Sequence, residues 1–528
     1  MGGCEEDLAD PFVPLLEKHA NVPDPGPDTS NKYVGDPAAI ALGKRFYFDP
    51  DFSGRAVHAD MLLREMTTPG RAALGEKINV SCNSCHDVAR GGADHTGDPP
   101  GNIVSFGGGA YDLNGQQSVN SAYAELVYWN GRNDSLWSQI VAVAESHVSV
   151  NGSRLRVAWR IIDKYRDEYT AVFPEYPLPA GLDSIAAAKA RLEPDGTCTL
   201  DNGTCPPDHC HMTYGRCTPR FPLEGRPGFV KPGQLATCDP QNADDILQPY
   251  GDAWDCMQLA DQLLINRIYV NWAKAIAAYE YTLISRDSPF DRWAAGGFVP
   301  GGLGASAERG ARLFVGKAAC ATCHSGPLFM DQQFHQIGVP QIGTYVPKTT
   351  DCPAGGWCDC VSDDRFEPTN CLPIGARDGI RKLHASKFRR DGAWSDDAEC
   401  QRNFVNHIDV NYAANHPEEC DGRVKYYALP LTDDLKGAWR TPGLRDIAIT
   451  GPYMHTGMYA TLRDVIVHYN KGGLVEGGEQ IGTLDQKIKP LNLSDQEIDD
   501  LVAFLETLTS TLDPSITSTP VIPPASAF

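Results

Sequence analysis

The segment "INVSCNSCHDVARGG" (residues 78–92) contains Cys82, Cys85 and His86 in the pattern C-x-x-C-H. The chain has 17 Cys and 14 His in 528 residues, and at that frequency the pattern should arise by chance about 0.015 times. It occurs twice, and the second copy, in "GKAACATCHSG", comprises Cys320, Cys323 and His324. The repeated pattern indicates a fold that is built twice around the same chemical group.

Three kinds of site use paired cysteines of this type: a redox disulfide, a zinc site and a c-type haem. A redox C-x-x-C does not require the adjacent His, and a His next to the second Cys cannot readily turn its ring to a zinc ion bound by that Cys. A c-type haem uses all three residues, because the two thiols fix the ring covalently and the His binds the iron. The sequence therefore predicts two haems, with His86 and His324 as proximal ligands.

The sixth position of each iron decides what the haem does. An iron with a weak or absent sixth ligand can bind peroxide or oxygen, whereas an iron closed by protein ligands is suited to electron transfer. Two haems in one chain therefore suggest one site for chemistry and one for electron uptake.

Composition limits the class of protein. The length of 528 residues is enough for about two to four domains, and 42% apolar with 22% charged residues is ordinary for a globular chain. The 51 Gly and 39 Pro indicate many turns and long loops. The net charge of −22 argues against nucleic acid or an anionic membrane surface as a partner, and leaves open a small basic electron donor. No apolar run reaches the length of about 18 residues that a membrane span needs.

Twelve further cysteines form two even clusters of six, within residues 198–256 and 352–420. Their Pro-, Gly- and Asp-rich surroundings predict disulfide-stapled loops and an oxidising compartment. The pairing stays open, and His209 and His211 beside Cys205 and Cys210 keep a zinc site as the alternative.

The remaining cysteine, Cys4, lies in the opening "MGGCEED". It is either the lipidated Cys of an exported lipoprotein or a spare thiol in a tail. The expected location is therefore the periplasm, or the outer membrane through a lipid anchor.

The expected fold is mainly α with long loops, because apolar residues recur every three or four positions while alternating runs of strand length are few. A long helix begins near Leu259, and a capping box of Ser494 and Glu497 begins the last clear helix. The predicted units are a tail (1–35), an N-terminal haem domain (36–180), a Cys-rich insertion (190–256), a C-terminal haem domain (257–510) with a second insertion (345–425), and a C-terminal tail (511–528).

The two motifs, together with "ALGKRFYFDPDFSG", "YWNGRNDSLWSQ" and "RTPGLRDIAITGPYMHTG", resemble the bacterial di-haem cytochrome c peroxidase and MauG family. The resemblance covers most of residues 40–180 and 259–510, but neither insertion. It implies two cytochrome c-like domains with a calcium ion between them, and often a homodimer. It further implies that the N-terminal haem reduces hydrogen peroxide to water, with electrons that the C-terminal haem takes from a small cytochrome or cupredoxin.

The resemblance also assigns individual residues. Trp129 matches the tryptophan between the haems, and Gln139 matches a polar residue near the peroxide-binding face. Asn114 matches a calcium ligand, and Thr450 and Pro452 match residues whose carbonyls complete that site. The alternatives are a core aromatic at 129, a solvent-facing residue at 139 and a turn without an ion.

Two departures concern the N-terminal haem. Asn102 stands where the peroxidases carry a histidine that blocks the iron, and His95 is the only nearby substitute, so we expect an open haem. Ser149 stands where the family carries its catalytic glutamate. Glu145 and His147 are the candidates to replace that acid, and the alternative is that both face solvent.

The third departure concerns the C-terminal haem. Its sixth ligand is a methionine in the peroxidases, but here Tyr469 aligns with that position, as a tyrosine does in MauG. Met458 and His468 are the competing ligands. A phenolate would stabilise ferric and higher oxidation states. Tyr469 therefore keeps a MauG-like oxidase, acting on a protein or organic substrate, as the second hypothesis. Ser149 keeps a third, an electron-transfer cytochrome without peroxide chemistry.

Overall fold

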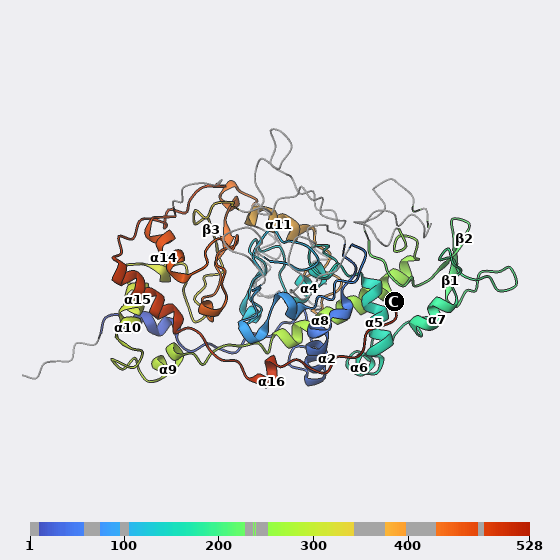
Figure 1. Ribbon diagram of the computed structural model, residues 1–528, viewed down its shortest axis with the longest axis horizontal. Helices are drawn as coiled ribbons and strands as arrows, with labels where there is room; N and C mark the ends of the chain where they lie inside the picture. The colour runs from blue at the N-terminus through green and yellow to red at the C-terminus, as the bar shows by residue number, and fades with distance from the viewer. Residues whose placement is uncertain are drawn as a thin grey trace, which may run out of the picture.

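The computed structural model describes residues 10–56, 74–95, 105–227, 236, 238, 252–342, 375–397, 429–473 and 480–528. Within these residues the chain is mainly helical with long connecting loops, as expected. The body is elongated, with α10, α14 and α15 at one end, α5, α6 and α7 with the β1–β2 hairpin at the other, and α8 between them (Figure 1).

One hydrophobic core surrounds α8 (Leu259–Glu280). We call the part of the molecule around this core the N-terminal half, because it contains α2 to α7 and the first motif. The helices around it are α2 (Pro37–Phe48), α4 (Leu136–Ala144), α5 (Arg154–Lys164) and α6 (Arg166–Val172), and α7 (Ile185–Ala190) follows. A second core lies between α10 (Ala305–Val315) and α15 (Asp495–Glu506). Its other helices are α1 (Val13–Leu16), α9 (Pro289–Ala295) and α14 (Leu462–Asn470). Three short helices remain: α3 (Cys82–Cys85), α11 (Ala376–Ala385) and α16 (Pro514–Thr517).

A glycine allows the closest helix crossing in each half. A Cβ at Gly43 of α2 would overlap the carbonyl oxygen of Ala275 in α8, and a Cβ at Gly310 of α10 would overlap that of Asp500 in α15. Side chains at these two positions would force the backbones apart. Each half therefore rests on one tight helix pair.

The described strands form two short antiparallel pairs. β1 (Cys210–Thr213) pairs with β2 (Arg216–Pro219), with Cys210 opposite Pro219. β3 (Phe334–His335) pairs with β4 (Trp439–Arg440), with His335 opposite Trp439. The second pair joins the loop after the second motif to the segment that precedes "TPGLRD".

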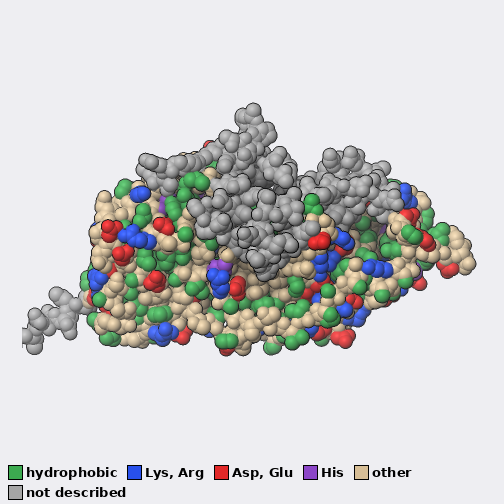
Figure 2. All heavy atoms as spheres, viewed as in Figure 1, with side chains coloured by type: hydrophobic (Ala, Val, Ile, Leu, Met, Phe, Trp, Pro, Cys, Tyr) green, Lys and Arg blue, Asp and Glu red, His purple; other side chains and the backbone are tan. Residues whose placement is uncertain are grey.

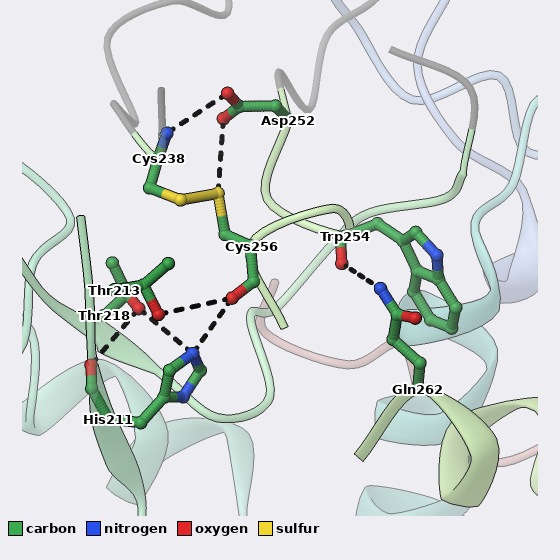
Figure 3. Close-up of a disulfide and its surroundings, with 8 residues drawn as sticks. All are labelled: His211, Thr213, Thr218, Cys238, Asp252, Trp254, Cys256 and Gln262. Carbon is green, nitrogen blue, oxygen red and sulfur yellow. Dashed lines mark hydrogen bonds between the residues drawn. A yellow bond between two sulfur atoms is a disulfide. The ribbon is translucent and has the colours of Figure 1, made fainter. Parts of the chain in front are cut away.

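Three disulfides hold the first Cys-rich segment, which confirms the disulfide prediction there. They are Cys198–Cys210, Cys205–Cys217 and Cys238–Cys256. Beside the last of them, His211 donates from Nε2 to the carbonyl of Cys256 at 2.9 Å (Figure 3). The zinc alternative is wrong, because Cys205 and Cys210 are consumed by disulfides. The second cluster, residues 352–420, and Cys4 lie outside the described residues.

Both predicted tails pack against the body where they are described. In residues 10–35, Leu16 and His19 are buried in the second core, and Asn31 donates to the carbonyl of Lys274 in α8 at 3.0 Å. At the other end, Ser526 donates its backbone N–H to Asp51 at 2.7 Å. These contacts hold parts of both predicted tails, residues 10–35 and 511–528, against the helical body.

Acidic and basic side chains are intermixed over the described part of the face in Figure 2. Among the described helices, none combines the length and the apolar character that crossing a bilayer requires.

Candidate haem sites

The first motif forms a single helical turn with its histidine at the end. Ser81 and Ser84 cap the turn reciprocally, and His86 follows as the C-cap residue. The His86 ring donates from Nδ1 to the carbonyl of Gly92 at 3.1 Å. This bond fixes the ring tautomer and leaves Nε2 for a metal.

The two thiols of the first motif are free and face the protein interior. Burial raises the pKa of Cys82 to about 12, and that of Cys85 well above its usual value. Both side chains nevertheless keep accessible surface. Two neighbouring thiols outside any disulfide suit covalent attachment to a ring.

The second motif repeats this arrangement. Cys320–Thr322 form a 3-10 turn, and His324 donates from Nδ1 to the carbonyl of Phe329 at 2.9 Å. Burial raises the pKa of Cys320 to about 12. In addition, His19 from the N-terminal segment lies with Nε2 3.1 Å from the carbonyl of His324. No sequence pattern predicts this contact, since 305 positions separate the two residues.

A cavity of about 300 Å³ lies against the second motif. Its size falls within the range of cofactor pockets, and its walls are mainly apolar. Cys320, Cys323 and His324 lie on one wall, and Tyr469 of α14 also lines the cavity. The free thiols, the oriented imidazole and the apolar walls together fit a covalently attached haem.

The three candidate sixth ligands differ in their surroundings. Tyr469 lines the cavity, and burial, with the nearby thiols of Cys320 and Cys323, raises the pKa of its hydroxyl. His468 has both ring nitrogens occupied, since Nδ1 is 2.9 Å from the Tyr459 hydroxyl and Nε2 is 2.8 Å from the carbonyl of Ile337. Met458 is not among the described residues that line the cavity. The geometry therefore favours Tyr469.

Trp129 lines the same cavity from the N-terminal half. Its indole donates to the carbonyl of Asn114 at 2.8 Å, and its own carbonyl accepts from the N–H of Arg440 at the same distance. His455, which stacks on Trp439 with ring centroids 4.2 Å apart, presents its edge to Trp129. Trp129 is thus a fixed part of the wall between the two halves.

The residue before Trp129 contacts Gln139, the residue expected near the peroxide-binding face. Tyr128 adopts a positive φ of 67°, its hydroxyl is 3.3 Å from Nε2 of Gln139, and the Arg132 guanidinium lies 3.5 Å above its ring. Of two consecutive residues in one loop, Tyr128 therefore contacts Gln139 and Trp129 lines the cavity at the second motif. Tyr128 and Arg132 were not among the predicted site residues, although both lie in the quoted "YWNGR" beside Trp129.

Tyr111 is a further residue of the first site that the sequence analysis missed. Burial raises the pKa of its hydroxyl, and the electrostatic influence of Tyr128, Arg132 and Cys85 on that pKa places it among them. The only sequence signal was its position after the glycine run at residues 107–109.

The residues expected to replace the catalytic glutamate are held in different ways. The Glu145 carboxylate accepts from Arg154 at 2.9 and 2.7 Å, so a role as a base would require this ion pair to open. Ser149 is buried, and its hydroxyl has no hydrogen-bond partner among the described residues. His147 is half-buried, and its carbonyl lies against Gly108.

Of the two residues expected to decide access to the first iron, one is described. His95 lies with Nε2 3.0 Å from the carbonyl of Arg90, as a loop histidine does. Asn102 lies outside the described residues.

Two of the three residues of the expected calcium site, Asn114 and Pro452, are in direct contact. Nδ2 of Asn114 is 2.6 Å from the carbonyl of Pro452 and 3.3 Å from that of Met454, while its Oδ1 is buried without a partner among the described residues. The nitrogen and oxygen of an amide are assigned from such contacts. If the Asn114 amide were turned over, its Oδ1 would lie beside the carbonyl oxygens of Pro452 and Met454. Thr450 packs against Gly91 of the first motif's loop. This oxygen-rich set fits a hard cation.

Glu280, at the end of α8, is a buried acid beside the first motif. Its side chain is 7% exposed, and Oε2 has no partner among the described residues. Burial raises its pKa from 4.5 to about 8. Its negative charge would raise the pKa of Cys82 and of Tyr47. The Tyr47 hydroxyl donates to the carbonyl of His86 at 2.8 Å.

We expect Glu280→Gln to stabilise the protein at pH 8 but not at pH 4.5. The unfolded chain ionises Glu280 above pH 4.5, whereas the folded chain keeps it protonated up to about pH 8. Stability is therefore lost as the pH rises between these values, by up to roughly 4–5 kcal/mol. Denaturant unfolding of both proteins at the two pH values measures the difference. The exposed Glu506→Gln is the control, and a gain that is equal at both pH values would contradict the prediction.

Known proteins are similar to this chain in sequence. Residues 37–194 match the family model described as di-haem cytochrome c peroxidase. The cytochrome-c peroxidase IdrP1 of Denitromonas iodatirespirans is 28% identical over 506 residues, which cover 95% of this chain and 87% of that protein. The methylamine utilization protein MauG of Methylorubrum extorquens is 31% identical over 249 residues, 47% of this chain and 46% of MauG.

A solved structure also aligns with the chain over most of its length. It is a MauG-like protein associated with microbial copper homeostasis, with a TM-score of 0.48 and 19% identity. The alignment covers 94% of this chain and 95% of that one.

Proposed function

The chain belongs to the di-haem cytochrome c peroxidase and MauG family, and on that premise we propose that it reduces hydrogen peroxide to water at the first motif. The electrons enter through the second motif. The observation that carries the proposal is the pair of C-x-x-C-H turns, each with its histidine tied through Nδ1 to a backbone carbonyl and joined by the Tyr128–Trp129 loop. Cytochrome c-like domains around both motifs are part of this proposal.

The family implies two c-type haems, and the chain offers a complete attachment set for each. Cys82, Cys85 and His86 would hold the first, and Cys320, Cys323 and His324 the second. When bound, a haem supplies a redox-active iron whose free sixth position can take peroxide. Trp129 lies on the path that one electron at a time would follow between the sites.

The polar groups at the first site would orient peroxide and handle its protons. Reduction of one peroxide to two waters consumes two electrons and two protons. Gln139 and the Tyr128 hydroxyl offer donors, and the Arg132 guanidinium favours developing negative charge. Ser149 is too weak an acid to replace a carboxyl, so proton delivery falls to His147, to Glu145 released from Arg154, or to water.

A second candidate function is a MauG-like oxidase of a protein or organic substrate. The observation that favours it is Tyr469, the one of the three candidate sixth ligands that lines the second cavity. A phenolate ligand would stabilise high oxidation states of that site. A pure electron-transfer cytochrome remains the third candidate, because Ser149 lacks the family's acid.

The surroundings of the protein are proposed on the same basis. Asn114, Thr450 and Pro452 would bind a calcium ion between the halves. The disulfides suit an oxidising compartment such as the periplasm, where Cys4 would carry a lipid anchor. The donor would be a small cytochrome or cupredoxin, and a homodimer is the proposed assembly.

The test is to mix the purified holoprotein with peroxide and a reduced small cytochrome c. We expect two equivalents of donor to be oxidised for each peroxide, and a five-coordinate haem in the spectrum of the fully oxidised protein. A lasting spectral change without donor oxidation would select the oxidase instead. No turnover and no spectral change would leave only the electron-transfer cytochrome.

A further inference from the structure

The N-terminal half supplies one wall of the second cavity. Residues 114–117 and 119–121, with Trp129, line it opposite elements that follow the second motif. The segment begins at Asn114 and ends in the 3-10 turn Ser121–Tyr123. A group held by the C-terminal motif is therefore also enclosed by the other half of the chain.

Asn120 presents an unpaired donor in this wall. Its side chain is 6% exposed, and its Oδ1 accepts from the backbone N–H of Ser285 at 2.8 Å. Because Oδ1 has a donor partner, the orientation of the amide is fixed and Nδ2 must carry the hydrogens. Nδ2 has no acceptor among the described residues.

Ser121 presents a second donor directly beside it. Ser121 lines the same cavity, and its hydroxyl is buried without a partner in the described part of the chain. Buried donors are normally paired, because an unpaired one loses its water without compensation. Two adjacent unpaired donors, on residues that line one cavity, indicate a ligand that brings an acceptor.

We propose that Asn120 and Ser121 bind a carboxylate of the haem attached at Cys320 and Cys323, so that the N-terminal half completes the second haem site. This inference rests on the proposed occupancy of that motif. A haem carries two propionate carboxylates, and an ionised carboxylate only accepts hydrogen bonds. The two donors lie in a loop about 200 residues before the motif in the chain. The motif and the donors therefore come from different halves of the molecule.

The two donors would favour the ionised form of the propionate. The potential of a haem falls as a nearby propionate loses its proton, because the negative charge stabilises the ferric state. Removal of a donor should therefore raise the pKa of the propionate, so that the potential falls at a higher pH. A hydrogen bond to a charged group corresponds to a shift of about one pH unit.

The experiment is a redox titration of the second haem against pH in the holoprotein and in two variants, Asn120→Asp and Ser121→Ala. Asn120→Asp keeps the acceptor for the Ser285 N–H and replaces only the unpaired donor, while Ser121→Ala removes the other donor without adding charge. We expect the pH of the fall to rise by about one unit in Ser121→Ala and by more in Asn120→Asp. Ser118→Ala is the matched control, because its hydroxyl contacts the Tyr47 hydroxyl at 3.1 Å and not the cavity.

Each outcome has a defined meaning. Unchanged pH profiles in both variants, with two haems per chain, would overturn the proposal and assign the donors to ordered water. A shift in only one variant would overturn the shared site. The measurement does not use peroxide, so wild-type protein with two haems but no turnover would contradict the proposed function and leave this test intact.

Discussion

Cys320→Ser with Cys323→Ser will leave the chain with one covalent haem instead of two. The thiols are free and line the cavity beside His324, so their removal leaves the ring without covalent attachment there. Electrons from the donor then lose their point of uptake, and peroxide turnover should fall to background. Peroxide should still change the spectrum of the remaining haem. Pyridine haemochrome analysis measures the haem content, and stopped-flow spectroscopy measures both reactions.

The reciprocal pair, Cys82→Ser with Cys85→Ser, is the matched control. It should also leave one haem, but the peroxide-induced change should vanish while the donor still reduces the remaining site. If peroxide instead reacted only with the protein that keeps the second motif, the assignment of the two sites would be reversed.

Arg160→Ala should lower the unfolding free energy of the N-terminal half by about 3–5 kcal/mol. Arg160 is fully buried and lies 2.9 Å from Asp49 and 3.0 Å from Asp51. It also donates to the carbonyls of Pro523 and Pro524 in the C-terminal segment, at 3.1 and 2.8 Å. Its removal leaves buried carboxylates short of a partner and releases the chain end. The midpoint of denaturant unfolding, followed by tryptophan fluorescence, measures the loss.

Arg463→Ala is the control for this effect. Arg463 pairs with Asp495 at 2.8 Å and Asp499 at 3.1 Å, but all three side chains are exposed to solvent. Such a pair contributes about 0–1 kcal/mol. Equal losses in the two variants would show that burial does not govern the Arg160 network.

Covalent and local features could be predicted from the sequence, because the residues that determine them are neighbours in the chain. The haem motifs, the capping box of Ser494 with Glu497 and the disulfide-bonded segment all depend on short spacings. The long helix near Leu259 followed from its apolar period, and it forms α8. Composition could not show where the two predicted tails lie, because the contacts of Asp51 and Arg160 with residues 523–526 join distant segments of the chain.

The site shows the same division. The sequence by itself determined which cysteines and histidines form the two attachment motifs, because the residues of each motif are neighbours in the chain. Only the tertiary structure decided that Tyr469 lines the cavity while both nitrogens of His468 are occupied, and that Glu145 is paired with Arg154. It alone brought Asn120 and His19 to the second site. Groups that meet across a cavity come from distant segments, and their contacts depend on how helices pack rather than on spacing along the chain.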